Sequence, residues 1–164
     1  RGIPVVAIKV GRTELAARLT VSHTGAIAGQ DASYAALFDR TVERVATGTV
    51  VRWQFNSPHS WLYLNVKNAD GTETLMSFEG SAPPSLLQRG VTGSSFEPGA
   101  TITISYCPMK DGRPAGGLGW VRLANGTFLN PSDGGCDGSE KAVERWKTWM
   151  AAGYTSSADA QKSK

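Results

Sequence analysis

The chain carries little charge, and charge of neither sign is concentrated in any part of it. Asp, Glu, Lys and Arg together make up only 19% of the 164 residues. The formal net charge of +3 divides into +2, +1 and 0 over residues 1–40, 41–129 and 130–164. Proteins that bind nucleic acid through its phosphates need a basic patch or stripe. The sequence offers none, and we therefore predict no nucleic-acid partner.

Long apolar runs are also missing. A transmembrane helix needs about 20 consecutive apolar residues, so we predict no transmembrane segment. Residues 26–28 read Ala-Ile-Ala, like a signal-peptidase site, but charged residues such as Lys9 and Arg18 interrupt the sequence before them. We expect residues 1–30 to belong to the mature protein and any export signal to precede Arg1.

Cysteine is scarce, because the chain has only Cys107 and Cys136. Their spacing excludes the C-x-x-C motif of zinc and thiol-redox sites. They flank a stretch rich in Gly, Pro and Asn, which a disulfide would usefully close. Such a bridge, across about 30 residues, contributes roughly 3–4 kcal/mol; two unpaired buried thiols are the alternative. A disulfide predicts an oxidising compartment, either the periplasm or the outside of the cell.

A complete catalytic constellation is missing as well. The chain lacks the G-x-S-x-G elbow that presents a nucleophilic serine. His59 has the chemistry of a general base, but Ser57 and Ser60 beside it are typical turn residues. We predict that the protein is not an enzyme and needs no cofactor.

What the sequence does contain predicts a mainly β fold. Its 19 glycines and 8 prolines supply many turns, and 40% apolar residues suffice for a core. The predicted strands are Val42–Trp53, Trp61–Lys67, Thr72–Glu79, Thr101–Tyr106 and Leu118–Leu123, with a short extension at Thr127-Phe128. A short helix is predicted over Ser81–Arg89. This order is that of a five-stranded OB-like barrel with one short helix between strands 3 and 4.

Details of the pattern predict where the barrel bends and what it buries. Leu62, Leu64 and Val66 alternate with polar or aromatic residues and should face the core. Leu86-Leu87 should form the buried side of the short helix. Gly48 interrupts the first strand and predicts a bulge or sharp bend there.

Two additions extend the predicted barrel. We divide the chain into an N-terminal arm, a barrel domain and a C-terminal helix with its tail, at residues 1–30, 31–136 and 137–164. Ser139 should cap a helix that runs to Ala152. Residues 155–164 are predicted from their composition to be disordered.

Apolar residues in both additions predict a protein interface. They are Ile3, Val5, Ile8 and Val10 in the arm, and Val143, Trp146, Trp149 and Met150 in the C-terminal helix. A strand can add to the sheet edge of a neighbouring chain, whereas the helical stripe can equally pack on its own barrel. We therefore predict a protein partner or a homo-oligomer. The leading hypothesis is a non-enzymatic cell-envelope protein that self-assembles or docks as an accessory subunit of a larger complex.

The segment Trp53–Trp61 is the best candidate for a ligand site, because it places His59 in a turn between aromatic residues. The predicted ligand-binding residues are Trp53, Asn56, His59, Trp61, Tyr63 and Glu79. Aromatic faces stack planar ligands, and imidazole suits copper and zinc. A periplasmic small-molecule or metal-binding module is therefore the alternative hypothesis. Otherwise His59 should hydrogen-bond within its turn and Glu79 should be solvated.

Two motifs occur in order along the chain. Residues 30–39, Q-D-A-S-Y-A-A-L-F-D, match A-H-H-S-F-x-A-E-F-D, and residues 53–61 match W-x-N-P-H-x-W with two inserted residues. With the segments 79–90 and 98–112, they resemble an uncharacterised family of small exported bacterial proteins over residues 30–129.

The departures from this family pattern affect the metal prediction. Asp31 and Ala32 stand where the family has paired histidines, and Leu37 stands where it has a glutamate. A histidine pair near a third histidine would suit a soft metal, but this chain retains only His59 of that set. Because transition-metal sites generally need three or four ligands, we assign no metal ligands from the sequence.

Overall fold

The computed structural model describes residues 36–162. The N-terminal arm, with its predicted interface residues Ile3, Val5, Ile8 and Val10, lies outside these residues. The described helices and strands are β1 (Arg44–Gln54), β2 (Ser60–Lys67), β3 (Glu73–Gly80), α2 (Pro83–Gln88), β4 (Thr101–Pro108), β5 (Ala115–Arg122), β6 (Phe128–Leu129), α3 (Glu140–Ala152) and α4 (Ser157–Lys162).

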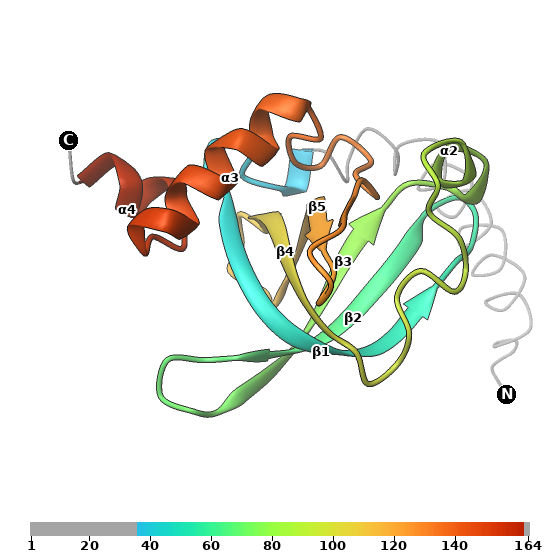
Figure 1. The fold of residues 1–164 in the computed structure, drawn as a ribbon, viewed down its shortest axis with the longest axis horizontal. Helices are drawn as coiled ribbons and strands as arrows, with labels where there is room; N and C mark the ends of the chain where they lie inside the picture. The colour runs from blue at the N-terminus through green and yellow to red at the C-terminus, as the bar shows by residue number, and fades with distance from the viewer. Residues whose placement is uncertain (1–35, 163–164) are drawn as a thin grey trace, which may run out of the picture. The chain divides into compact units, whose positions relative to one another are not determined.

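The five long strands close into a barrel (Figure 1). Antiparallel pairs join β1 to β2, β2 to β3, β1 to β4 and β4 to β5. A parallel pair between β3 and β5 completes the ring. This confirms the predicted fold class, since the protein is mainly β and has one short helix between its third and fourth strands.

The core fills the barrel much as the alternation in β2 predicts. Leu62, Leu64 and Val66 are all buried, as expected. In α2, Leu86 is fully buried but Leu87 is 55% exposed, so the prediction that both are buried is wrong for Leu87. Consecutive helical residues point about 100° apart, and a helix of six residues has only one covered side.

The bulge in β1 does not lie at Gly48. The register of β1 on β2 shifts between Val50 and Arg52, which places the irregularity at Val51. Gly48 has a different role, because a Cβ added there would lie 2.5 Å from the carbonyl oxygen of Asn65. The glycine is therefore required for close approach of β1 to β2.

A nine-residue segment between β6 and α3 covers the outer surface of β5. We call residues 130–138 the strap. A Cβ on Gly117 of β5 would lie 2.8 Å from the backbone of Gly135 in the strap, and a Cβ on Gly80 of β3 would lie 2.9 Å from the carbonyl oxygen of Pro131. Glycine at these strand positions thus permits the strap to lie directly on the barrel wall.

The disulfide predicted between Cys107 and Cys136 is present. It joins β4 to the strap, and both cysteines are buried. In the part of the chain that the structure describes, no helix is long and apolar enough to cross a membrane.

The C-terminal helix α3 packs on the barrel. It runs from Glu140 to Ala152 as predicted and ends at Gly153, which has a positive φ of 82°. Ser139 occupies the N-cap position, but its side chain makes no capping hydrogen bond. Trp146 is 1% exposed, and its ring meets Phe128 edge to face at 5.3 Å.

Arg145 of α3 ties the helix to two carboxylates. Its Nη2 lies 2.9 Å from Oε1 of Glu43 and 2.6 Å from Oδ2 of Asp137. Burial raises the pKa of Glu43, although Arg145 acts in the opposite direction. Burial also pushes the pKa of Asp137 upward, but hydrogen bonds from Arg145 and Ser139 outweigh it and leave that pKa lowered.

The prediction that residues 155–164 are disordered is wrong for the described part of this segment. Residues 157–162 form α4, and the backbone before it pairs with the start of β1. Val45 N–H donates to the Thr155 carbonyl over 2.7 Å, and Ser157 N–H donates to the Glu43 carbonyl over 2.8 Å. These backbone contacts do not depend on side-chain composition, so the sequence pattern did not reveal them.

Candidate functional site

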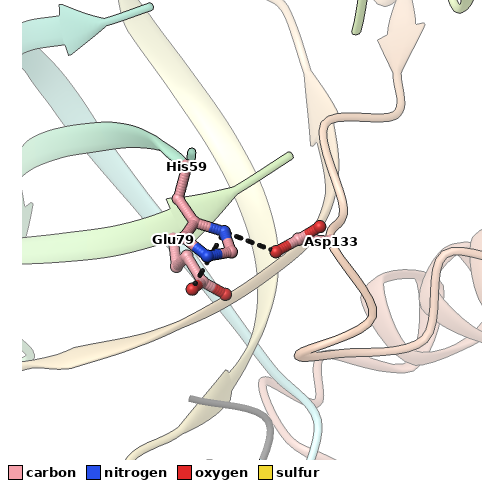
Figure 2. A group of neighbouring side chains, drawn as sticks. All are labelled: His59, Glu79 and Asp133. Carbon is pink, nitrogen blue, oxygen red and sulfur yellow. Dashed lines mark ion pairs between the residues drawn. The ribbon is translucent and has the colours of Figure 1, made fainter. Parts of the chain in front are cut away.

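Three ionisable side chains from separate segments meet on the outside of the barrel wall. Figure 2 shows the imidazole of His59 between two carboxylates, with Glu79 reaching from β3 and Asp133 from the strap. Nδ1 of His59 lies 2.7 Å from Oδ2 of Asp133 and 3.4 Å from Oε2 of Glu79. One potential ligand atom from each residue lies within 4.8 Å of the other two.

Strand pairing brings His59 beside Glu79. The β2–β3 register places Ser60 opposite Gly80 and Trp61 opposite Glu79. The N–H of Ser60 donates to the carbonyl of Ser81 over 3.1 Å. His59 precedes β2 by one residue, so its side chain reaches the outer surface next to Glu79.

Glu79 is buried, with only 2% of its surface exposed, and the prediction that it is solvated is wrong. Side chains alternate along β3, so Phe78 fills the barrel while Glu79 points outward, where the strap covers it. Burying a carboxylate is costly unless charges or hydrogen bonds compensate for it. The contact with His59 provides such compensation when the imidazole carries a proton.

Asp133 was missed by the sequence analysis. It lies in the Gly-rich strap, which passes over β3 and β5, and its neighbour Gly134 has a positive φ of 84°. The run Ser132-Asp133-Gly134 is a typical turn signal. No local pattern could have shown that this turn folds back onto His59, because the contact depends on the path of the strap.

Several contacts hold the strap in place around Asp133. Nη1 of Arg89 donates to the carbonyls of Asn130 and Ser132, each over 2.9 Å. Ser81 Oγ donates to Oδ1 of Asp133 over 3.3 Å. Burial lowers the pKa of Arg89, and the charge of Asp133 acts in the opposite direction. Asp133 therefore reaches His59 from a segment that Arg89 anchors immediately before it.

The other predicted ligand residues do not share one face. Trp53 lies in the core, where its Nε1 donates to the carbonyl of Thr92 over 2.9 Å and its ring meets Phe96 at 4.9 Å. Trp61 and Tyr63 are half-buried on the outer side of β2, and Asn56 is exposed. From the predicted set, the structure thus brings together His59 and Glu79, with Trp61 beside Glu79 in the β2–β3 register.

The predicted interface stripe of α3 divides in two. Val143 and Trp146 are buried against the chain's own barrel, together with Trp120. Trp149 is half-buried, and Met150 is 40% exposed. Of this stripe, only the second pair is available to another protein.

Comparison with known proteins identifies the family of the chain. The match to the "Family of unknown function (DUF6152)" covers residues 19–118. This region includes His59 and Glu79, whereas Asp133 lies beyond it. No curated protein and no solved structure matches the chain. The inferred membership of an uncharacterised family is thereby confirmed, and the chain belongs to the DUF6152 family of unknown function.

Proposed function

We propose that this protein binds a divalent transition-metal ion, Zn²⁺ or Cu²⁺, at His59, Glu79 and Asp133. The observation that carries the proposal is the convergence of one imidazole nitrogen and two carboxylates within 4.8 Å, from three segments far apart in the sequence. The sequence alone supported no metal assignment, because the chain retains only His59 of the family's histidine set.

The distances are close to those that a metal ion requires. Zinc binds imidazole nitrogen and carboxylate oxygen at about 2 Å, so tetrahedral ligand atoms lie roughly 3.3 Å apart. Nδ1 of His59 and Oε2 of Glu79 are 3.4 Å apart. Oδ2 of Asp133, at 2.7 Å from Nδ1, would move outward by roughly 0.6 Å. The Asp133 side chain is 27% exposed and has room to do so.

Charge also favours a cation at this position. Two carboxylates face a single imidazole, and Glu79 is almost completely buried. A proton on His59 neutralises one of the two negative charges and Arg89 interacts with Asp133, whereas a divalent ion held between the carboxylates would contact both directly. Nitrogen with carboxylate oxygen is a ligand set that suits Zn²⁺ and Cu²⁺. Three protein ligands would leave a fourth position for water, as in zinc sites that exchange ligands.

The test is calorimetric titration of the full chain, first freed of metal with EDTA, with Zn²⁺ and separately with Cu²⁺. We expect one equivalent to bind. His59→Gln, Glu79→Gln and Asp133→Asn should each weaken binding by at least about tenfold, because even residues that only orient a ligand have effects of this size. His23→Gln, which alters the other histidine, is the matched control. Unchanged affinity in His59→Gln would refute the proposal.

The assembly hypothesis remains a second candidate, supported by the exposure of Met150 beside Trp149 on α3. It predicts an oligomer that Met150→Ser or deletion of residues 1–30 dissociates. Size-exclusion chromatography with light scattering tests this directly, and a monomeric full chain would remove self-assembly. For either function we propose an oxidising compartment, the periplasm or the cell exterior, on the strength of the Cys107–Cys136 disulfide.

A further inference from the structure

We infer that the metal site becomes competent only when Cys107 and Cys136 are oxidised to their disulfide. This inference rests on the proposed metal-binding function and adds a condition to it. Asp133 reaches His59 from the strap, and the disulfide is the covalent link between the strap and the barrel wall. Without that link, two of the three ligands remain on the barrel, while the third lies on a segment held there by hydrogen bonds and packing contacts alone.

The disulfide lies close enough to Asp133 along the chain to fix the position of its side chain. Cys136 follows Asp133 by three residues, and Cys107 lies in β4 opposite Gly117 of β5. The backbone of Gly135 lies against Gly117. The disulfide therefore holds the strap against β5 near Gly117, which is the part of the barrel wall that the strap covers.

The strap is costly to order, and its shape depends on hydrogen bonds within it, such as those from Asn130 Nδ2 to the Gly138 carbonyl and from Ser132 N–H to Asn130 Oδ1. Three of its nine residues are glycine, at positions 134, 135 and 138, and glycine loses more conformational freedom on ordering than any other residue. Two further hydrogen bonds within the strap join residues between Ser132 and Cys136, so they depend on the position of Cys136. Ser132 Oγ donates to the Cys136 carbonyl over 2.9 Å, and Gly134 N–H donates to Ser132 Oγ over 3.2 Å.

The oxidation is an ordinary exchange with a small disulfide, for which glutathione disulfide is the probe. One cysteine thiolate attacks a sulfur of glutathione disulfide, forms a mixed disulfide and releases one glutathione thiolate. The second cysteine thiolate then displaces the other glutathione and forms the Cys107–Cys136 bond. The two cysteines lose two electrons, and glutathione disulfide gains them as two thiols. Because both cysteines are buried in the folded chain, we expect this step to accompany folding and to be slow to reverse.

The test compares zinc affinity of the oxidised full chain with that of Cys107→Ala/Cys136→Ala. A variant is preferred to chemical reduction, because dithiol reductants bind zinc themselves. We expect the double variant to keep its circular dichroism spectrum and to bind Zn²⁺ at least about tenfold more weakly. Adding Asp133→Asn to it should cause little further loss, since the two changes act through the same ligand. If the double variant does not fold, Cys107→Val/Cys136→Ala replaces it, because valine fills more of the space left by the bridge.

A second measurement separates this inference from the metal proposal. Hydrogen exchange over residues 130–138 and the imidazole NMR signals of His59 are recorded without metal, in the oxidised chain and in the variant. Faster exchange in the strap and shifted His59 signals are expected, whether or not zinc binds. Unchanged exchange and signals, or zinc affinity within twofold of the oxidised chain, would overturn the inference. Failure of the oxidised chain itself to bind metal would instead refute the proposed function.

Discussion

The contact between the strap and β5 makes Gly117→Ala an informative substitution. The added methyl group would lie 2.8 Å from the Cα and carbonyl carbon of Gly135. Real Cβ atoms do not approach backbone this closely, and neither backbone can rotate away as a side chain could. The strap must therefore move off the wall, and Asp133 moves with it.

Two opposing effects determine the size of the change. Overpacking in a close-packed region typically costs about 1–3 kcal/mol. Replacing glycine by alanine restricts the unfolded chain and returns about 0.4–1 kcal/mol where the backbone tolerates it. We therefore expect Gly117→Ala to lower the free energy of unfolding by about 1–2 kcal/mol. For a domain of this size, each kcal/mol lowers the melting temperature by about 2–4 °C.

Gly93→Ala is the matched control. Its added methyl group would meet only the Phe55 ring, at an ordinary contact distance of 3.5 Å, and its φ lies outside the positive range. It should leave the protein as stable as wild type or more so. Urea denaturation gives the free energies, and zinc titration gives the effect on the proposed site. If Gly117→Ala is as stable as Gly93→Ala and binds zinc normally, the close packing of the strap is not what positions Asp133.

Three further predictions concern α3 and the effect of pH. Trp146→Ala should cost about 3–5 kcal/mol by urea denaturation, because its ring is buried against the barrel, whereas Met150→Ala should cost much less. Since burial raises the pKa of Glu43 above its ordinary value of 4.5, the folded state holds this proton longer than the unfolded state, and stability from Glu43 is lost as pH rises through the folded pKa. As pH rises above about 4.5, wild type should therefore lose stability relative to Glu43→Gln, which has no carboxyl proton to release. Identical dependence of the free energy of unfolding on pH in the two proteins would contradict this. In the pH range where His59 is mostly protonated, zinc affinity should fall by roughly tenfold for each unit by which the pH is lowered, because the proton and the metal compete for one nitrogen. Calorimetry at several pH values would measure this.

Short-range patterns predicted most of the fold. The alternation of Leu62, Leu64 and Val66 and the helix that runs to Ala152 depend on neighbours in sequence, and both are present. The errors arose where a distant segment decides the environment. Gly48 is required by the closeness of β2, and the segment after α3 is held by backbone pairing with β1.

The candidate site shows the same distinction between what local patterns indicate and what contacts between distant segments decide. His59 was predicted as a ligand residue because it lies in a turn between aromatic residues, and Glu79 because it is a carboxylate at the end of a strand. The alternative was that His59 only hydrogen-bonds within its turn and that Glu79 is solvated. Their meeting follows from the β2–β3 register, and the burial of Glu79 follows from the strap above it. Asp133 could not be identified, because a turn-forming Asp-Gly pair has the same local pattern wherever its segment leads.

By itself, the sequence determined the class of the fold, the order of its strands along the chain and the family, because these depend on periodicity, turn chemistry and motifs that lie within short stretches. It left the two cysteines open between a disulfide and free thiols, and the structure shows the disulfide. Only the tertiary structure decided which polar groups form a site. Barrel closure and the Cys107–Cys136 link carry the strap across β5 and place Asp133 2.7 Å from His59. An electrostatic site depends on distances between side chains, and for residues far apart in the chain those distances exist only after folding.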